Sequence, residues 1–287
     1  MIVAPKTEGV LFHYTTHDAL HSIVENRNLR ATNAYYLNDS NEIVFAINHF
    51  QRLLDAAADE AENTKIANFY FELSRWLYGL KTNAHYIFVF SLSEHRNLLS
   101  QWRAYTKHGS GVSIGFNVTD LERLAARNQL SLTKCIYERD ECQRRLANEL
   151  ERIKSEFLAA FPHLPTEYVA TQVEYLDFLN RQAEPLLKVF CALKDSTFRE
   201  EGEWRLISKY YKYYTDPSIK FRPSKSTLIP FIEIDISEMR DDGLLFEQVY
   251  PGPSPNFDLS FQAISAFLSN KRACNVTINP QSSWTER

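Results

Sequence analysis

Short apolar stretches lie toward both ends of the chain, and longer stretches with helical spacing lie between them. Residues 112–116 alternate between apolar side chains and Ser or Gly, which predicts a strand with two distinct faces. Residues 85–92 are almost all apolar and rich in aromatic side chains, so they predict a strand buried on both faces. Further extended segments are expected at residues 9–14, 29–36, 203–209, 228–236, 244–250 and 274–279.

Helical periodicity dominates the rest of the chain. Thr16 is a suitable N-cap for a helix over residues 17–26, because its hydroxyl can accept a hydrogen bond from a free backbone N–H group. Residues 41–80 predict two helices that separate near residues 63–64. Residues 138–194 predict two long helices divided by Pro162 and Pro165. Shorter helices are expected near residues 98–105 and 256–270.

The strands therefore cluster toward the two ends of the chain, with helices between them. This order predicts an α+β fold with a small mixed or antiparallel β core rather than a regular βαβ alternation. We expect residues 1–287 to form a single domain in which residues around 138–194 are a large helical insertion.

Composition narrows the class of protein. The 287 residues are 44% hydrophobic and 24% charged, which is ordinary for a globular protein. The net charge of −4 gives no general attraction to nucleic acid, so such binding would need a local basic patch. The four cysteines form no CxxC pair, and the chain has neither a signal-peptide pattern nor an apolar run of about 18 residues. We therefore expect a cytoplasmic protein that does not enter a membrane.

The first candidate for chemistry is Glu201-Gly202-Glu203-Trp204-Arg205. In an extended segment, Glu201, Glu203 and Arg205 share one face. Two carboxylates beside an arginine suit charge-stabilised chemistry at a sugar, because one can stay ionised while the other handles a proton. The alternative is a surface strand whose charges form weak cross-strand ion pairs.

Three further segments carry polar groups. His13 lies on a strand of mainly apolar residues and needs a polar partner if it is buried, so a purely structural histidine is an equal alternative. Asn38-Asp39-Ser40-Asn41-Glu42 is typical of a helix N-terminus. Ser91 and Arg103 flank a strand end followed by a helix start, where backbone N–H groups can bind phosphate. His17 and His21 have helical spacing, but we expect surface residues there and predict no metal site.

These segments occur in an order that resembles a bacterial family known as domain of unknown function 2971. The resemblance extends over residues 9–255 and rests on short motifs in a fixed order. The motifs are His13-Tyr14, Asn38-Asp39-Ser40-Asn41-Glu42, Ser91 with Trp102 and Tyr105, Gly111-Val112-Ser113-Ile114-Gly115-Phe116, and Glu201-Gly202-Glu203-Trp204-Arg205.

A more distant likeness is to ADP-ribosyltransferases, which carry a histidine on an early strand and a glutamate on a late strand. Glu201-Gly202-Glu203 is similar to the Glu-x-Glu of their arginine-directed branch. The likeness implies a split β core with NAD bound in a cleft between two small sheets. The catalytic residues would then be Glu203, Glu201 and His13. The implied NAD-binding residues are His13, Tyr14, Tyr35, Tyr36, Ser91, Arg103, Tyr105 and Arg205.

In this interpretation, Glu203 stabilises the oxocarbenium-like transition state as nicotinamide leaves, and Glu201 orients the acceptor. The acceptor would be a protein or nucleic acid, and a cognate regulatory protein would be a further partner. The biological role would be that of a toxin or anti-phage effector. Two alternatives stay open. One is a non-catalytic module that binds a ligand or partner on the same fold. The other is a nucleic-acid-processing enzyme that holds a divalent metal through Glu201, Glu203 and Asp39.

Overall fold

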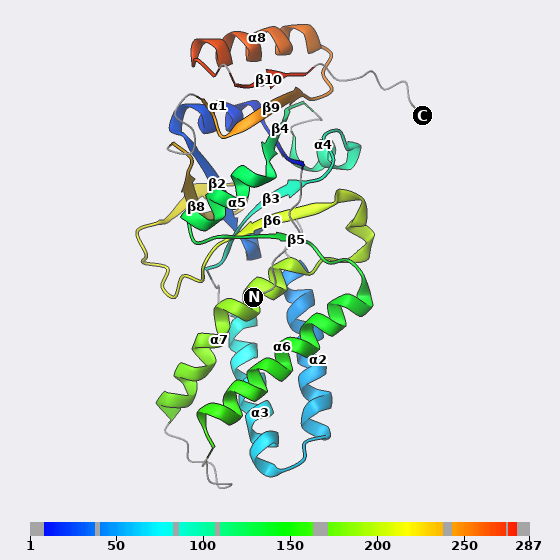
Figure 1. Cartoon of the computed structure of the whole chain (residues 1–287), viewed down its shortest axis with the longest axis vertical. Coiled ribbons are helices and arrows are strands. Elements are labelled where there is room, and N and C mark those ends of the chain that lie inside the picture. Colours follow the sequence, from blue (N-terminus) through cyan, green and yellow to red (C-terminus); the bar gives the residue numbers. More distant parts are fainter. Residues whose placement is uncertain are drawn as a thin grey trace.

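The computed structural model describes residues 9–37, 41–82, 86–106, 110–162, 172–237, 243–273 and 275–279. A mostly antiparallel sheet forms one part of the molecule, and a bundle of four long helices forms the other (Figure 1). The predicted α+β class is confirmed. The helices are α1 (His17–Asn26), α2 (Asn41–Asp59), α3 (Thr64–Thr82), α4 (Leu99–Tyr105), α5 (Val118–Arg127), α6 (Arg139–Ala160), α7 (Gln172–Ala192) and α8 (Phe257–Asn270).

Ten strands of the described residues join in one sheet. Its main path runs β10-β9-β4-β1-β3-β2-β8-β7, and β6 pairs with both β3 and β5 beside this path. Only the β9–β10 pairing is parallel among the described strand pairs. The strands are β1 (Val10–Thr15), β2 (Asn28–Asn33), β3 (Phe88–Ser93), β4 (Val112–Asn117), β5 (Ser131–Lys134), β6 (Glu203–Ile207), β7 (Ile219–Pro223), β8 (Leu228–Asp235), β9 (Phe246–Pro251) and β10 (Thr277–Ile278).

Strand β3 is the centre of this sheet. Along one side it pairs with β6 from Val89 to Ser93, which is all of β3 except Phe88. Along the other side it pairs with β1 only at Ser93 and with β2 only at Phe88 and Val89. The sheet therefore divides beside β3, with β1 and β4 in one branch and β2, β8 and β7 in the other. Its apolar sequence matches this position, since five of its six residues are buried.

The helical bundle has a core of its own. Apolar side chains of α2, α3, α6 and α7 pack together, among them Phe50, Leu73, Phe157 and Phe190, each 1% exposed or less. The bundle thus combines the segment around 138–194, which we expected to be an insertion, with the helices at 41–82. A second core forms where α1, α5 and α8 pack on the sheet.

Local sequence explains several of these elements. Helix α1 begins as predicted, with the Thr16 hydroxyl accepting a hydrogen bond from the Ala19 N–H at 3.2 Å. The two helices expected in residues 41–80 are α2 and α3. Strands β5 and β7 and helix α5 were not predicted. Strand β5 is short and polar, and β7 ends in a proline at an edge of the sheet.

Candidate functional site

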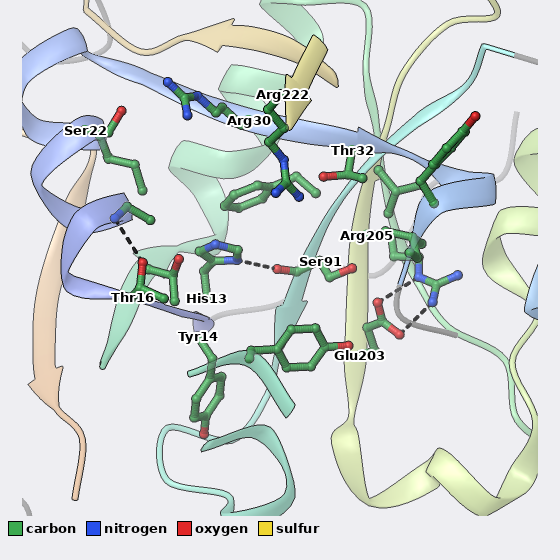
Figure 2. Close-up of a pocket in the computed structure, with 18 of the residues that line it drawn as sticks. His13, Tyr14, Thr16, Ser22, Arg30, Thr32, Ser91, Glu203, Arg205 and Arg222 are labelled. Atoms are coloured by element: carbon green, nitrogen blue, oxygen red, sulfur yellow. Dashed lines mark hydrogen bonds and ion pairs between the residues drawn. The ribbon is translucent and has the colours of Figure 1, made fainter. Parts of the chain in front are cut away.

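A cavity of about 380 Å³ opens where β1 and β2 separate beside β3. Most of its lining residues lie on β1, β2, β3, β6 and β7, and others come from α1, α2 and α4. His13 and Ser91 lie together in this cavity (Figure 2). A smaller hollow of about 40 Å³ shares several of these residues and also contacts Gln101 and Glu201.

His13 lies on β1, which pairs with β4 at this point but has no pairing partner on its β3 side. Its Nδ1 lies 2.9 Å from the carbonyl oxygen of Ser91, and its ring stacks on Phe90 with centroids 4.2 Å apart. A carbonyl can only accept, so Nδ1 must carry the proton and Nε2 is left as an acceptor. Burial lowers the pKa of His13 to about 4, against a smaller raising effect of the Ser91 hydrogen bond. The ring is therefore neutral at pH 7.

Glu203 and Arg205 form the wall opposite His13 (Figure 2). Arg205 Nε donates to Glu203 Oε1 at 2.8 Å, and Arg205 Nη2 donates to Glu203 Oε2 at 2.8 Å. This is the bidentate geometry that makes arginine–carboxylate pairs strong. Arg205 also donates to Glu42 Oε2 at 2.5 Å and to the Cys191 carbonyl at 2.7 Å. Its side chain is 3% exposed, so this guanidinium is committed to protein acceptors.

Lys194 lies at the centre of the remaining charges. Its ammonium is 3.1 Å from Glu42 Oε1, 2.6 Å from Glu201 Oε2 and 2.7 Å from Glu203 Oε2. We refer to Glu42, Lys194, Glu201, Glu203 and Arg205 as the buried charge cluster. Three carboxylates face two cations in it, which leaves a formal charge of −1.

Burial and ion pairing act in opposite directions on the pKa values of Glu203 and Lys194, and pairing outweighs burial in both. Desolvation by itself would raise the pKa of Glu203, but the charges of Arg205 and Lys194 lower it to about 2. The same pairing raises the pKa of Lys194 above its ordinary range, although burial works in the opposite direction. Glu203 is therefore an ionised carboxylate at neutral pH and unsuited to donating a proton.

Gly202 makes the turn between Glu201 and Glu203. Its φ of 50° lies in the left-handed region, which glycine adopts without a side-chain clash. Glu201 therefore ends a short 3-10 helix over Ser196–Glu201, while Glu203 begins β6. The expectation that Glu201, Glu203 and Arg205 alternate along one strand was wrong for Glu201. The alternative of a surface strand with weak ion pairs was also wrong, since all three residues are buried.

Most of the residues expected to bind the ligand line the cavity, namely His13, Tyr14, Tyr36, Ser91, Tyr105 and Arg205. Tyr36 and Tyr105 are both partly buried, as stacking side chains at a ligand site would be.

Two of the expected ligand residues, Tyr35 and Arg103, do not line the cavity. Tyr14 does line it, but its side chain points away from Arg222 and Ser91 (Figure 2), and its hydroxyl donates to the His95 carbonyl at 2.6 Å. Tyr14 also accepts from the Leu98 N–H at 2.9 Å, which takes up a backbone group expected to bind phosphate. Tyr35 packs against the helical bundle and donates to the Leu80 carbonyl at 2.7 Å. Arg103 is exposed and does not line the cavity.

The structure adds residues that sequence reasoning did not place here. Arg222 from β7 and Arg30 and Thr32 from β2 line the end of the cavity away from Glu203 (Figure 2). Strand β7 was not predicted, so its arginine could not be assigned. Glu42 and Lys194 join the site from α2 and from the end of α7. Asn38, Asp39 and Ser40 of the predicted motif lie outside the described residues.

Comparison with known proteins identifies one family. Residues 101–206 match the model of a family described as a protein of unknown function (DUF2971). The DUF2971 resemblance is therefore confirmed over this range. The range includes Lys194, Glu201, Glu203 and Arg205 of the buried charge cluster, and it begins after His13 and Glu42. Comparisons with curated proteins and with solved structures gave no match.

The described residues contain no group of three or more His, Cys, Asp or Glu side chains that could hold a metal ion. Among the described helices, none has the length and apolar character needed to cross a membrane.

Proposed function

We propose that the chain is an NAD-using, ADP-ribosyltransferase-like enzyme whose substrate binds in the cavity between β1 and β2. The observation that carries this proposal is that residues from separate sequence motifs line one cavity. His13, Ser91 and Glu203 lie on three strands that are neighbours in the sheet, and all three line the same cavity together with Tyr36 and Tyr105. These are the residues that the likeness to ADP-ribosyltransferases singles out.

Each residue has a defined task in this proposal. The Nε2 atom of His13 accepts a hydrogen bond from a ribose hydroxyl, because Nδ1 is occupied by Ser91. Tyr36 and Tyr105 contact the nicotinamide ring. Glu203 stays ionised and stabilises the positive charge that develops at the ribose when the glycosidic bond breaks. Nicotinamide leaves with the bonding electron pair, and a nucleophile of the acceptor forms the new bond and loses a proton. Glu201, beside the smaller hollow, orients that acceptor.

Nicotinamide release tests this proposal directly. The purified chain is incubated with NAD and fractions of cell extract that supply acceptors, and released nicotinamide is quantified by chromatography. We expect release by the wild type and a loss of at least about 100-fold in Glu203→Gln, a typical size for one electrostatic catalytic group. His13→Phe keeps the stacking on Phe90 and should lose activity as well.

Glu200→Gln is the matched control, because Glu200 is an exposed neighbour outside the cavity. Thermal unfolding of each variant separates a lost activity from a lost fold. Absence of release by the wild type with every acceptor fraction, or unchanged release in both Glu203→Gln and His13→Phe, would refute the enzymatic proposal.

A second candidate function is a non-catalytic binding module. The observation that favours it is that Lys194 and Arg205 already bond both oxygens of Glu203. A carboxylate so neutralised has less charge to offer a transition state. This candidate predicts that NAD or a related nucleotide raises the unfolding temperature without any release of nicotinamide.

The proposal also concerns the cellular setting. We propose a cytoplasmic location, a macromolecular acceptor and a cognate regulatory protein. We also propose a role as a toxin or antiviral effector. Cys135, Cys142 and Cys191 are free thiols, which agrees with a reducing compartment.

A further inference from the structure

The β2, β8 and β7 branch of the sheet turns a row of cationic side chains toward the cavity side. Strand register pairs Arg222 with Ile229 and Thr32 with Phe231. Residues 229 and 231 are two apart on β8, so Arg222 and Thr32 share one face of the sheet. Arg30 lies two residues before Thr32 on β2 and has the same orientation. Figure 2 shows the Arg222 guanidinium extending toward His13 and Thr32.

The opposite end of this face carries the buried charge cluster. Thr32 pairs with Val89 of β3, and Ser91, two residues further on, pairs with Arg205 of β6. The lining therefore runs from two arginines, past Ser91 and His13, to a cluster with a net charge of −1. This makes the cavity electrostatically asymmetric.

The cations at the two ends differ in how they are paired. Lys194 and Arg205 are both neutralised by carboxylates within 3.1 Å. The ion pair of Arg30 is weaker, because its Nε lies 3.9 Å from Glu233 Oε1 and Glu233 also pairs with Lys220. Within the part of the chain that the structure describes, the Arg222 guanidinium has neither a hydrogen-bond partner nor an ion-pair partner. A partly buried, unpaired arginine that points into a cavity is suited to an anionic ligand.

We infer that Arg222, assisted by Arg30, binds the phosphate groups of the ligand, so that the cavity accepts a phosphate-bearing nucleotide in a single orientation. This inference rests on the proposed function and specifies which end of the substrate lies where. With phosphate groups at Arg222, a ribose lies near His13 and the bond to be broken lies toward Glu203. The reverse orientation would place phosphate charge against the net negative cluster, which is repulsive.

Binding of ADP compared with adenosine tests the inference without any catalytic step. Each compound is titrated calorimetrically into the full-length wild type, Arg222→Gln, Arg30→Gln and Arg103→Gln. Arg103 is the matched control, because it is an exposed arginine that does not line the cavity. We expect the wild type to bind ADP more tightly than adenosine, and the difference to shrink as the salt concentration rises.

We expect Arg222→Gln to weaken ADP binding about tenfold or more and to leave adenosine binding unchanged, as the loss of a charged hydrogen bond does. Arg30→Gln should have a smaller effect, and Arg103→Gln none. Since Arg222 has no partner in the described fold, its variant should unfold at the wild-type temperature.

Equal ADP binding by the wild type and Arg222→Gln would overturn the inference, as would equal affinity of the wild type for ADP and adenosine. Nicotinamide release separates this inference from the proposed function. If ADP binds through Arg222 but NAD is never cleaved, the inference stands and the enzymatic proposal fails. If NAD is cleaved equally well by Arg222→Gln, the proposal stands and the inference fails.

Discussion

Replacing Lys194 with methionine should be severely destabilising. The Lys194 side chain is 1% exposed and its ammonium lies within 3.1 Å of three carboxylates. Methionine fits the aliphatic part of the site but leaves Glu42, Glu201 and Glu203 with Arg205 as the only cation of the cluster. Removing one partner of a buried ion pair typically costs about 3–5 kcal/mol, because the remaining charge is desolvated without compensation.

That cost is a large part of the stability of an ordinary domain, which is about 5–15 kcal/mol. For a chain of this size, each kcal/mol lowers the unfolding temperature by roughly 2–4 °C. The variant should therefore unfold at least about 6 °C below the wild type. Its deficit should also shrink in acid, since protonation of a carboxylate relieves the repulsion among the three glutamates.

Urea unfolding followed by circular dichroism at pH 7 and pH 4 measures both effects. Lys188→Met is the matched control on α7, the helix that ends two residues before Lys194. Lys188 pairs with Glu184 at 2.8 Å, but both side chains are partly exposed, so the loss should be below about 1 kcal/mol. Similar losses in Lys194→Met and Lys188→Met would refute the conclusion that the cluster is a buried, interdependent network.

Two further predictions concern pH. The wild type should lose up to about 3 kcal/mol of unfolding free energy as pH falls from 6.5 to about 4. The reason is that folding lowers the pKa of His13 to about 4, so the unfolded chain takes up the proton at a higher pH than the folded chain does. In His13→Phe, urea unfolding across this range should show that this loss is absent, and an unchanged slope would contradict a buried neutral His13. Glu203 affects stability in a lower pH range, because its pKa falls from 4.5 to about 2 on folding. Its contribution of about 3 kcal/mol is present above pH 4.5 and lost toward pH 2, so Glu203→Gln should unfold less steeply with acid over that window.

Local sequence signals were enough to predict much of the fold. Thr16 predicted the start of α1, and the nearly all-apolar residues 85–92 predicted a strand buried on both faces, which is β3. Helix α5 was missed although its signal is present, since Asn117 caps it and Leu121 and Leu124 share its buried side. Strands β5 and β7 carry little local signal, because their partners on β6 and β8 determine their structure.

The candidate site was predictable only in part. His13, Ser91 and Glu203 could be selected from their positions in ordered motifs. Their environment could not be, because it depends on contacts between distant parts of the chain. Arg205 bonds Glu42, which lies 163 residues away in the sequence. No local pattern indicates that the Arg205 guanidinium is occupied by protein acceptors while Arg222 has no partner among the described residues.

The motif already favoured Glu203 over Glu201 as the acidic residue, and the structure places the two in different elements. The left-handed turn at Gly202 leaves Glu201 at the end of a 3-10 helix and turns Glu203 into the main cavity. Glu203 therefore faces the same space as His13, which agrees with the role proposed for it.

The central claim is that NAD binds in the cavity beside β3. Calorimetric titration of NAD into the wild type and His13→Phe tests it most directly. We predict saturable binding to one site per chain in the wild type and an affinity at least about tenfold lower in His13→Phe, which lacks the Nε2 acceptor. Absence of saturable binding by the wild type, or equal affinity in both proteins, would contradict the claim.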